Sequence, residues 1–459
     1  LLADGLRCLG YALYLGGALV WLRWCLRHEM AILTRQAFHL VGKTWCFGTQ
    51  RLPDGEDFYY GNLQERLIHR GVRMLLLCGE GSLISLRPQQ WRAFASAQAS
   101  TTNSARLPEL ALVHPATPLR VAVGQFLAAW RVAWMSAGMS DPVVRSVGWR
   151  AVRGCLARQT MRNVLSCWIG RAAVKQWRPQ AYVALYEGHS WEQCLWRGVK
   201  TADPSCRTVG YQHTGLKPSN LALLHPRHTA DHGWQPDVVC CLGPWAQARL
   251  TPAHPASRLL SFGSFRYPPS DGDALGGPRP ARRTVLVVPE GLWSEAKLLF
   301  ELAMRIAPLL PDHRFIFRCH PAFPFAQVRP TLAWGPERFP NVEISSSEAL
   351  EPDLKRSSVV LYRGSAAVLY ALLEGLKPLY VQGEGEADGL DPLCELRIWR
   401  DVVPSAEAVQ QVLQRYAAMR EPDAADQWRQ ATESVRAYTT PVTEASIDQF
   451  LSAIGLTHA

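Results

Sequence analysis

Five short and almost entirely apolar segments alternate with helical patterns in the second half of this chain. The segments are residues 284–291, 314–321, 341–345, 358–365 and 377–383. Each has the length of a β-strand, and strands without a polar face are buried on both sides. Helical patterns lie between them, such as the apolar positions that follow Ser294. Buried strands separated by helices predict a parallel sheet covered by helices on both faces, which is a Rossmann-like, doubly wound domain.

The first half of the chain repeats this scheme less regularly. Four apolar segments again run into loops, at residues 72–81, 181–188, 207–215 and 237–245. The two halves are separated by residues 267–283, which are rich in Pro, Gly and Asp and have no hydrophobic period. Such a stretch is typical of a domain boundary.

These patterns predict the organisation of the whole chain. We expect one Rossmann-like domain over residues 1–270, with a helical insert at about 82–180, and a second over 284–440. Residues 441–459 are predicted to form a helix that packs back on the first domain. With 48% hydrophobic and 19% charged residues, the chain is neither a disordered nor a fibrous protein.

The charge and cysteine content restrict the partners and the compartment. The chain has 49 Lys and Arg against 39 Asp and Glu, and its net charge of +10 favours anionic partners such as phosphates, nucleotides or anionic lipid. No nucleic-acid-binding motif accompanies this charge, so no nucleic-acid partner is expected. The twelve Cys include no CxxC pair and no zinc spacing, so no metal site is predicted. Free thiols favour a reducing compartment, and we expect a cytoplasmic protein.

Two segments suggest contact with a membrane. Residues 8–22 are apolar, but the run is short for a membrane span, and a buried helix is the favoured interpretation. Residues 145–178 carry seven Arg, one Lys, three Trp and no acidic residue. This composition suits a helix that rests on anionic lipid at the inner membrane, and it suits the solvated basic face of an ordinary helix equally well.

In the second predicted domain, polar residues follow the strands at their carboxyl ends, where ligands of parallel sheets bind. Arg363, Gly364 and Ser365 precede a helix whose N-terminal N–H groups favour a phosphate, and Ser365 is its expected N-cap. Arg318 and His320 end another strand, where the histidine can bind a phosphate or donate a proton. Glu290 and Gly291 lie on the first turn from strand to helix. These residues are candidates for donor binding, and His320 is also a candidate catalytic residue.

The first predicted domain contributes a second group of polar residues. Glu187 follows the segment 181–185 and would emerge at the edge of the sheet, where a carboxylate can act as a base or nucleophile toward a sugar. His189 lies in the same loop. Gln212 and His213 lie in the next loop along the chain. We interpret Glu187 as catalytic and the other three as residues of the acceptor side of a cleft.

The order of these motifs carries a family resemblance. The motifs YEGxxWE, GYQHTG, VxPEG, RxHP, LYRGSAA and LEGLKPLYV follow one another between residues 181 and 381. In this order they resemble bacterial surface-carbohydrate (capsule and O-antigen) biosynthesis glycosyltransferases of the GT-B type, related to Kdo transferases. The wider group also holds polysialyltransferases and CDP-glycerol polymerases.

The resemblance implies a GT-B fold, in which two Rossmann-like domains face a cleft and the second binds a nucleotide sugar. Carried over by motif, His320 and Ser365 would contact the donor phosphate, Glu187 would be the catalytic carboxylate and Glu290 would help at the donor site. The acidic residue that holds the ribose in many such enzymes is replaced here by Leu369 and Tyr370. No DxD motif occurs in the second half, which fits chemistry without a metal.

The sequence thus favours transfer of Kdo or a related acid sugar from a CMP donor to a surface polysaccharide or lipid-linked acceptor. The nucleotide sugar would be a substrate, and no cofactor is expected. Two alternatives stay open: a CDP-glycerol-type polyol-phosphate transferase, and a catalytically silent GT-B scaffold. A peripheral position at the inner membrane is a further open alternative to a purely cytoplasmic one.

Overall fold

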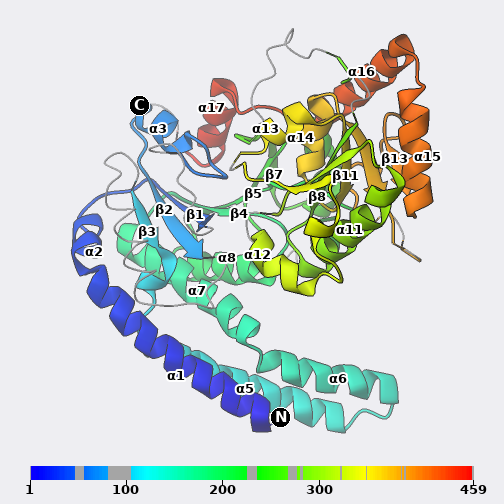
Figure 1. The fold of residues 1–459 in the computed structure, drawn as a ribbon. Helices are drawn as coiled ribbons and strands as arrows, with labels where there is room; N and C mark the ends of the chain where they lie inside the picture. Colours follow the sequence, from blue (N-terminus) through cyan, green and yellow to red (C-terminus); the bar gives the residue numbers. More distant parts are fainter. Residues whose placement is uncertain are drawn as a thin grey trace.

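The structure is a computed structural model that describes residues 2–46, 56–80, 105–224, 235–266, 277–279, 283–320, 323–347, 349–383, 385–386 and 389–456. Within these ranges the chain forms two parallel sheets, one in each half (Figure 1). Of the predicted linker, residues 267–276 and 280–282 lie outside the described residues, as do residues 81–104 of the predicted helical insert.

The first sheet has the order β3-β2-β1-β4-β5-β6-β7 among the described residues, and all of its pairings are parallel. Its strands are β1 (Leu40–Cys46), β2 (Met74–Glu80), β3 (Arg106–Pro108), β4 (Ala181–Leu185), β5 (Arg207–Tyr211), β6 (Val238–Cys241) and β7 (Arg258–Ser261). The direction of winding reverses between β1 and β4. The carboxyl ends of these two strands therefore flank the position where doubly wound sheets bind ligands.

The second sheet has the order β10-β9-β8-β11-β12-β13 among the described residues and is again parallel throughout. Its strands are β8 (Thr284–Pro289), β9 (Arg314–Phe317), β10 (Val342–Ile344), β11 (Val359–Arg363), β12 (Lys377–Val381) and β13 (Asp401–Val403). Here the winding reverses between β8 and β11. The predicted fold class, two Rossmann-like doubly wound domains, is confirmed.

The strands are near-continuous apolar runs because helices cover both faces of each sheet. Every residue of β11 is buried, and so is every residue of β12. The helices of the second half are α11 (Trp293–Ile306), α12 (Phe325–Val328), α13 (Glu351–Arg356), α14 (Ala367–Leu373) and α15 (Ala406–Ala417), with short 3-10 turns η3 (Ala307–Leu309), η4 (Arg329–Thr331) and η5 (Pro336–Arg338). Phe300 of α11 stacks on Phe317 of β9 with ring centroids 4.4 Å apart, which anchors that helix to the sheet.

The described residues of the first half form nine helices. They are α1 (Leu2–Cys25), α2 (Arg27–Leu33), α3 (Leu63–Ile68), α5 (Thr117–Ala137), α6 (Pro142–Cys155), α7 (Arg158–Trp177), α8 (Ser190–Ala202), α9 (Leu221–Leu224) and α10 (Pro244–Leu250), with 3-10 turns η1 (Glu109–Leu112) and η2 (Thr251–Ala253). Helices α1, α5 and α6 lie together at one end of the molecule, at the bottom of Figure 1. Of the described helices, α1 alone is long and apolar enough to cross a membrane, judged by length and composition, and a third of its most apolar window is buried against the protein.

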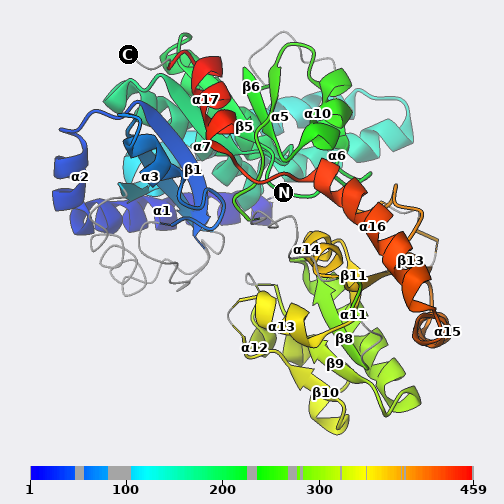
Figure 2. The ribbon, with the colours of Figure 1, turned by 90° about the horizontal axis from the view of Figure 1, so that it is seen from above.

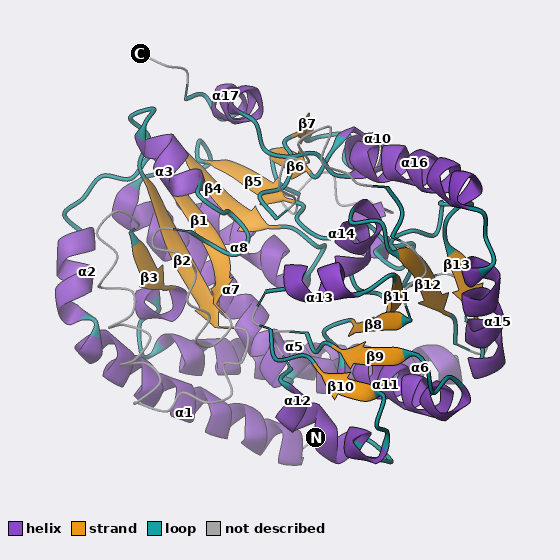
Figure 3. Cartoon of the chain, turned by 45° about the horizontal axis from the view of Figure 1, so that its top comes forward, coloured by secondary structure: helices purple, strands orange, loops and turns teal. Residues whose placement is uncertain are grey.

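Two C-terminal helices connect the two sheets. Helix α16 (Glu421–Tyr438) runs from the second sheet to the first, contacting α14 and α10 (Figure 2). Its last residue, Tyr438, stacks on Trp245 with ring centroids 4.4 Å apart and donates a hydrogen bond of 3.1 Å to the carbonyl of Leu216. The chain thus leaves the second sheet and returns to the first before it ends (Figure 3).

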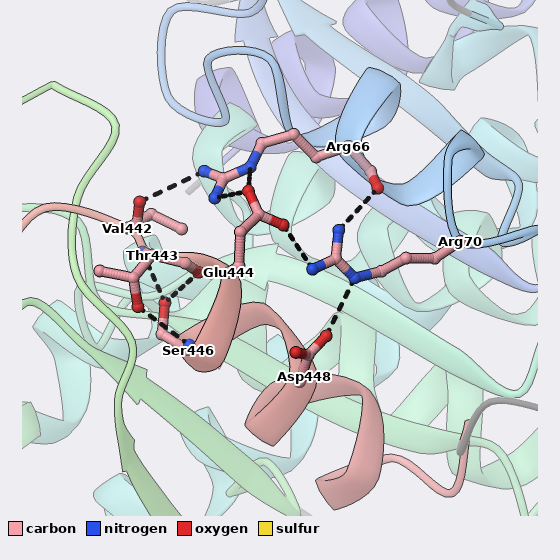
Figure 4. Close-up of polar contacts among 7 residues, drawn as sticks. All are labelled: Arg66, Arg70, Val442, Thr443, Glu444, Ser446 and Asp448. Carbon is pink, nitrogen blue, oxygen red and sulfur yellow. Dashed lines mark hydrogen bonds and ion pairs between the residues drawn. The ribbon is translucent and has the colours of Figure 1, made fainter.

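Helix α17 (Glu444–Ala453) packs on the first sheet. Its residues Ile447, Phe450 and Leu451 share a hydrophobic cluster with strands β5 to β7. Figure 4 shows the polar side of this contact, in which Arg66 and Arg70 hold Glu444, and the Nε atom of Arg70 lies 2.9 Å from Asp448 Oδ1. Apolar packing and charge therefore both fix this helix to the first half of the chain.

Candidate functional site

The predicted site residues follow strands that meet at the reversal points of the two sheets. In each sheet the loops after the two strands at the reversal carry polar side chains, and the loops after the neighbouring strands carry more. These residues are Glu187 after β4, His213 after β5, Glu290 after β8, His320 after β9 and Ser365 after β11. The two edges touch: the backbone N–H of Ser219 donates to the carbonyl of Gly389 at 2.9 Å, and Lys217 forms an ion pair with Glu290.

Glu187 is held between two histidines of the first domain. Its Oε2 lies 2.8 Å from His189 Nε2, and its Oε1 lies 3.0 Å from His213 Nε2. Burial alone would raise the pKa of Glu187, but hydrogen bonds from both histidines and their charge lower it well below the usual range. The hydrogen bond to Glu187 raises the pKa of His189 in turn, against the effect of burial. Glu187 is therefore an ionised carboxylate at neutral pH, with imidazole N–H groups aimed at both oxygens.

A second carboxylate shapes the loop that carries Glu187. Glu192, on the first turn of α8, is fully buried and accepts hydrogen bonds of 2.9 Å from the backbone N–H groups of Glu187, Gly188 and His189. Burial raises the pKa of Glu192 to about 8. Gly188 has a φ of +85°, and a Cβ there would lie 2.9 Å from Ala222, so the turn requires glycine. Glu192 thus positions Glu187 without facing the site.

His213 lies on the ring of Tyr59, edge to face, with centroids 4.7 Å apart. The His213 side chain is buried, and its Nδ1 has no hydrogen-bond partner among the described residues. Arg266 lies over the ring of Phe58, 4.7 Å from its centroid, and near Tyr59. The segment after β1 therefore joins the group around Glu187, although Tyr59 was not among the predicted site residues.

Gln212 differs from its predicted role on the acceptor side. Its side chain is fully buried, donating from Nε2 to the carbonyl of Thr214 and accepting at Oε1 from the N–H of Leu242, 3.0 Å away. Both ends of the amide are thus occupied by backbone. The prediction for Gln212 is corrected: it fixes the loop that carries His213, and does not line the site.

Glu290 connects the two domains. One oxygen pairs with Lys217, which lies in the loop after β5, and the other, Oε2, is buried without a partner among the described residues. Glu290 lies directly against Gly364: a Cβ at Gly364 would come within 2.2 Å of Glu290 Oε2, and φ there is +70°. Lys217 was not among the predicted residues, and its place four positions after His213 in the same loop is the signal that could have found it.

His320 lies over the backbone of Gly291, where a Cβ would be 3.0 Å from its Nδ1. Burial, together with the charges of Arg266 and Lys217 and against the charge of Glu187, lowers the pKa of His320 to about 4. These contributions place His320 in the electrostatic environment of Glu187 and Lys217, across the junction of the two domains. At neutral pH it is a neutral imidazole, able to donate one hydrogen bond and accept another.

The two arginines predicted to neutralise a donor phosphate are already neutralised by their own domain. Arg363 pairs with Glu295 and, at 2.5 Å, with Glu386. Arg318 pairs with the fully buried Asp353 at 2.7 Å. Each guanidinium thus balances acidic groups of the second domain, and donor binding by Arg318 and Arg363 stays a prediction.

Ser365 follows Gly364 but does not cap its helix as predicted. Helix α14 begins at Ala367 with Ala366 as the N-cap, and Ser365 Oγ accepts only a long hydrogen bond of 3.4 Å from the Ala367 N–H. The loop lies against the first domain, since a Cβ at Gly215 would be 3.8 Å from Ala366 Cβ. The Ser365 hydroxyl therefore keeps hydrogen-bonding capacity at the domain junction.

We expect Gly364→Ala to disturb the junction directly. The new methyl group would meet Glu290 Oε2 in a left-handed backbone conformation that costs an alanine about 1–2 kcal/mol. The variant should melt several degrees below the wild type in a thermal unfolding experiment. Gly124→Ala is the matched control, because its Cβ meets open space on a helix, and it should not lower the melting temperature. Equal melting temperatures for Gly364→Ala and wild type would contradict the close approach of Glu290 to this glycine.

Other features of the chain do not add to this site. No group of three or more His, Cys, Asp or Glu in the described part of the chain is placed to hold a metal ion. A cavity of about 140 Å³ lies elsewhere, between α1, β1 and α7, and is lined by Lys43, Glu109, Arg162 and Trp191 among others. Leu369, at the position where many such enzymes carry an acidic ribose ligand, is fully buried in the core.

Comparison with known proteins supports the fold. No model of a known family and no curated protein matches the sequence. Among solved structures, the glycotransferase of kitacinnamycin is 11% identical, with 91% of this chain and 99% of that chain covered and a TM-score of 0.51. The calicheamicin glycosyltransferase CalG4 is 14% identical, with 92% and 99% covered and a TM-score of 0.52. MnaA of S. aureus, solved with UDP, is 9% identical, with 92% and 98% covered and a TM-score of 0.52. The chain therefore has the GT-B fold.

Proposed function

We propose that this chain is a glycosyltransferase that moves a sugar from a nucleotide donor to a hydroxyl group of a glycan. The observation that carries the proposal is the meeting of Glu187 and its two histidines with Glu290, Lys217 and His320 at the junction of two GT-B domains. Solved structures of the same fold include two glycosyltransferases and a protein bound to UDP. The first domain brings an ionised carboxylate and a lysine to the junction, and the second domain brings a neutral imidazole.

On the acceptor side, Glu187 would take the proton of the attacking hydroxyl group. A carboxylate with a lowered pKa is a weak base, so one of its hydrogen bonds has to be released first. His189 is the exposed partner, whereas His213 is buried. An acceptor hydroxyl that takes the place of His189 removes one of the contacts that lower the pKa of Glu187. The hydroxyl oxygen then bonds to the anomeric carbon as the bond from that carbon to the donor phosphate breaks.

On the donor side, Lys217 and His320 would balance the charge of the departing phosphate, and the Ser365 hydroxyl would bind it. Arg318 and Arg363 form ion pairs within their own domain, whereas Lys217 pairs with Glu290 across the domain junction, so we assign this role to Lys217 because of its position. No step of this scheme needs a metal ion. We further propose a CMP-activated acid sugar such as Kdo as donor and a surface polysaccharide as acceptor, on the basis of the order of motifs in the sequence.

The test is thermal unfolding of the purified protein with CMP, CDP, UDP, GDP and ADP in parallel. A nucleotide at a hundred times its dissociation constant stabilises the folded state by about 2.7 kcal/mol, which raises the melting temperature by several degrees. We expect a shift with CMP that is lost in His320→Ala and Ser365→Ala. The control is His313→Ala, a partly buried histidine of the same domain before β9, which should retain the shift.

Each other outcome has a definite meaning. A stronger shift with CDP would favour polyol-phosphate transfer, and a shift with UDP or GDP alone would change the donor class. No shift with any nucleotide would contradict the enzyme and favour a silent GT-B scaffold.

A further inference from the structure

Helix α1 carries two apolar stripes, of which only one faces the protein. Residues Cys8, Ala12, Leu15, Leu19 and Leu22 are buried against the rest of the first domain. A second stripe, formed by Leu2, Leu6, Leu9, Leu13, Val20 and Trp24, is exposed. Its spacing follows the helical repeat, so these residues share one outer face. An ordinary surface helix has a polar outer face, and this one does not.

Helix α5 has the same two-sided character. Val121, Ala122, Gln125 and Ala129 are buried, whereas the outer stripe of Leu119, Val123, Phe126, Leu127, Trp130 and Trp134 is exposed. The Trp130 and Trp134 side chains are 72% and 77% exposed. The two helices are in contact, since the Phe126 ring of α5 packs against Gly5 of α1. Both exposed stripes therefore belong to the end of the molecule shown at the bottom of Figure 1, where they add to one apolar surface.

Helix α6 extends this surface and adds charge. It packs on α5 through Gly148, where a Cβ would overlap Ser136, and nearly all of its other residues are exposed. Val143, Val147 and Trp149 are exposed beside Arg145, Arg150 and Arg153. We call the exposed residues of α1, α5 and α6 the α1/α5/α6 face.

The charge around this face is mostly positive, with Asp4 on α1 as an exception. Between Glu109 and Glu187 the sequence has ten Arg and Lys and a single acidic residue, Asp141. No described acidic side chain pairs with Arg131, Arg145, Arg150 or Arg153. Exposed tryptophans flanked by arginines are the composition of a surface that lies in the interface of a membrane, with aromatic rings at the headgroup level.

We propose that the α1/α5/α6 face docks on an anionic membrane surface. A second copy of the chain would also cover the apolar stripes, but it would bring two strongly basic faces together. Anionic lipid headgroups, in contrast, neutralise the arginines while the leucines and tryptophans enter the headgroup region. The inference does not depend on the proposed reaction, because none of these residues belongs to the junction of the two domains.

The sequence pattern indicates a basic helix at residues 145–178 as the segment that contacts lipid. The structure instead places the exposed large apolar residues on α1, α5 and α6. Helix α7 covers the second half of that stretch and buries Leu165, Ile169, Ala173 and Val174 in the core. Its outer face carries none of the exposed large apolar residues. The apolar contacts with lipid therefore come from α1, α5 and α6, and the basic residues of α6 flank them.

The test is co-sedimentation of the whole protein with vesicles of phosphatidylcholine, with and without about 30 mol% phosphatidylglycerol. We expect binding to the anionic vesicles that weakens at high salt. The double variant Trp130→Glu/Trp134→Glu should lower the partition coefficient by roughly tenfold or more, because each replaces an interfacial anchor by a charge. The triple variant Arg145→Gln/Arg150→Gln/Arg153→Gln should lower it by a similar factor on anionic vesicles only. Trp334→Glu, in the second domain, is the matched control and should bind like the wild type.

Circular dichroism and thermal unfolding show whether each variant is folded, and sedimentation velocity reports its oligomeric state. Equal binding of Trp130→Glu/Trp134→Glu and wild type would overturn the proposal. A dimer that this variant dissociates, without vesicle binding by the wild type, would assign the face to a second copy of the chain and also overturn it. Retention of the wild type on vesicles after an alkaline wash would show that α1 inserts, and would replace docking by insertion.

Discussion

Replacing Glu187 by glutamine should reduce turnover by about 10²–10⁴-fold while the protein stays folded. Glutamine keeps the shape of the side chain, but it cannot take a proton and cannot accept hydrogen bonds from two histidines at both ends. The measurement is release of the nucleotide from a panel of nucleotide sugars in the presence of glycan acceptors. Glu65→Gln, an exposed carboxylate of the same domain, is the matched control and should keep full activity. Full turnover by Glu187→Gln would remove this residue from the chemistry.

The same variant has a second readout that does not require a known substrate. Glu187 has a lowered pKa, so its contribution to stability is present above its ordinary value of 4.5 and is lost as the pH falls through its folded pKa. His189 has a raised pKa, so its contribution is present below its ordinary value of 6.5 and is lost as the pH rises through its folded pKa. The pair therefore stabilises the fold most fully between pH 4.5 and pH 6.5.

Glu187→Gln should accordingly lose more stability between these pH values than at pH 9, which thermal unfolding across pH measures. The His189 pKa should also fall in the variant, because the carboxylate that raises it is gone, and NMR titration of the imidazole would report this directly. A variant that loses the same stability at every pH would mean that the Glu187–His189 pair is not formed in solution.

The fold could be predicted from the sequence more fully than the candidate site. Residues such as those of β11 and β12 are buried on both faces, so their composition alone predicts a parallel sheet, and the structure confirms it. Gly364 and Gly291 were predicted because backbone turns after such strands have few solutions, and both lie against functional side chains. The local sequence pattern therefore predicts where the loops occur and which of their positions require a glycine.

The ion-pair partners of charged side chains could not be predicted from the local sequence pattern. Arg363 pairs with Glu295 on α11 and with Glu386 beyond β12, and these residues are far from it in the sequence. Lys217 pairs with Glu290, which lies in the other domain. Whether an arginine is free for a phosphate or already neutralised depends on such long-range pairs. For this reason Lys217 was missed, and the ion pairs of Arg318 and Arg363 were not foreseen.

The buried ion pair between Lys43 and Glu109 also joins residues that are far apart in the sequence. Its loss should have the largest effect on the stability of the protein. Lys43 lies in the middle of β1, a strand that was not predicted from the sequence, and is 1% exposed. Its Nζ lies 2.6 and 2.8 Å from the two oxygens of Glu109 in η1. The same Nζ lies 4.3 Å from the ring centroid of Trp191 and 4.7 Å from that of Trp45. The charge is thus enclosed by one carboxylate and two aromatic faces.

Lys43→Met should destabilise the protein by about 3–5 kcal/mol, because it leaves the Glu109 carboxylate buried without a counter-charge. For a domain of this size the melting temperature should fall by roughly 10 °C. Methionine fills nearly the same volume as lysine, so the loss reports the charge and not a cavity. Arg283→Met is the matched control, since Arg283 and Asp312 form an exposed pair whose loss should leave the melting temperature unchanged.

The double variant Lys43→Met/Glu109→Met tests whether the ion pair makes a net contribution to the free energy of unfolding. The free energy lost by removing two charges from water can be about as large as the free energy gained from their attraction. In that case, removing both charges should restore the melting temperature to that of the wild type or above it. Restoration would show that the pair serves a purpose other than stability. The cavity of about 140 Å³ lined by Lys43, Glu109, Trp45 and Trp191 is the feature such a purpose would involve. A double variant as unstable as Lys43→Met would instead show that the pair itself holds β1 to η1, and that the methionines cannot replace its two hydrogen bonds.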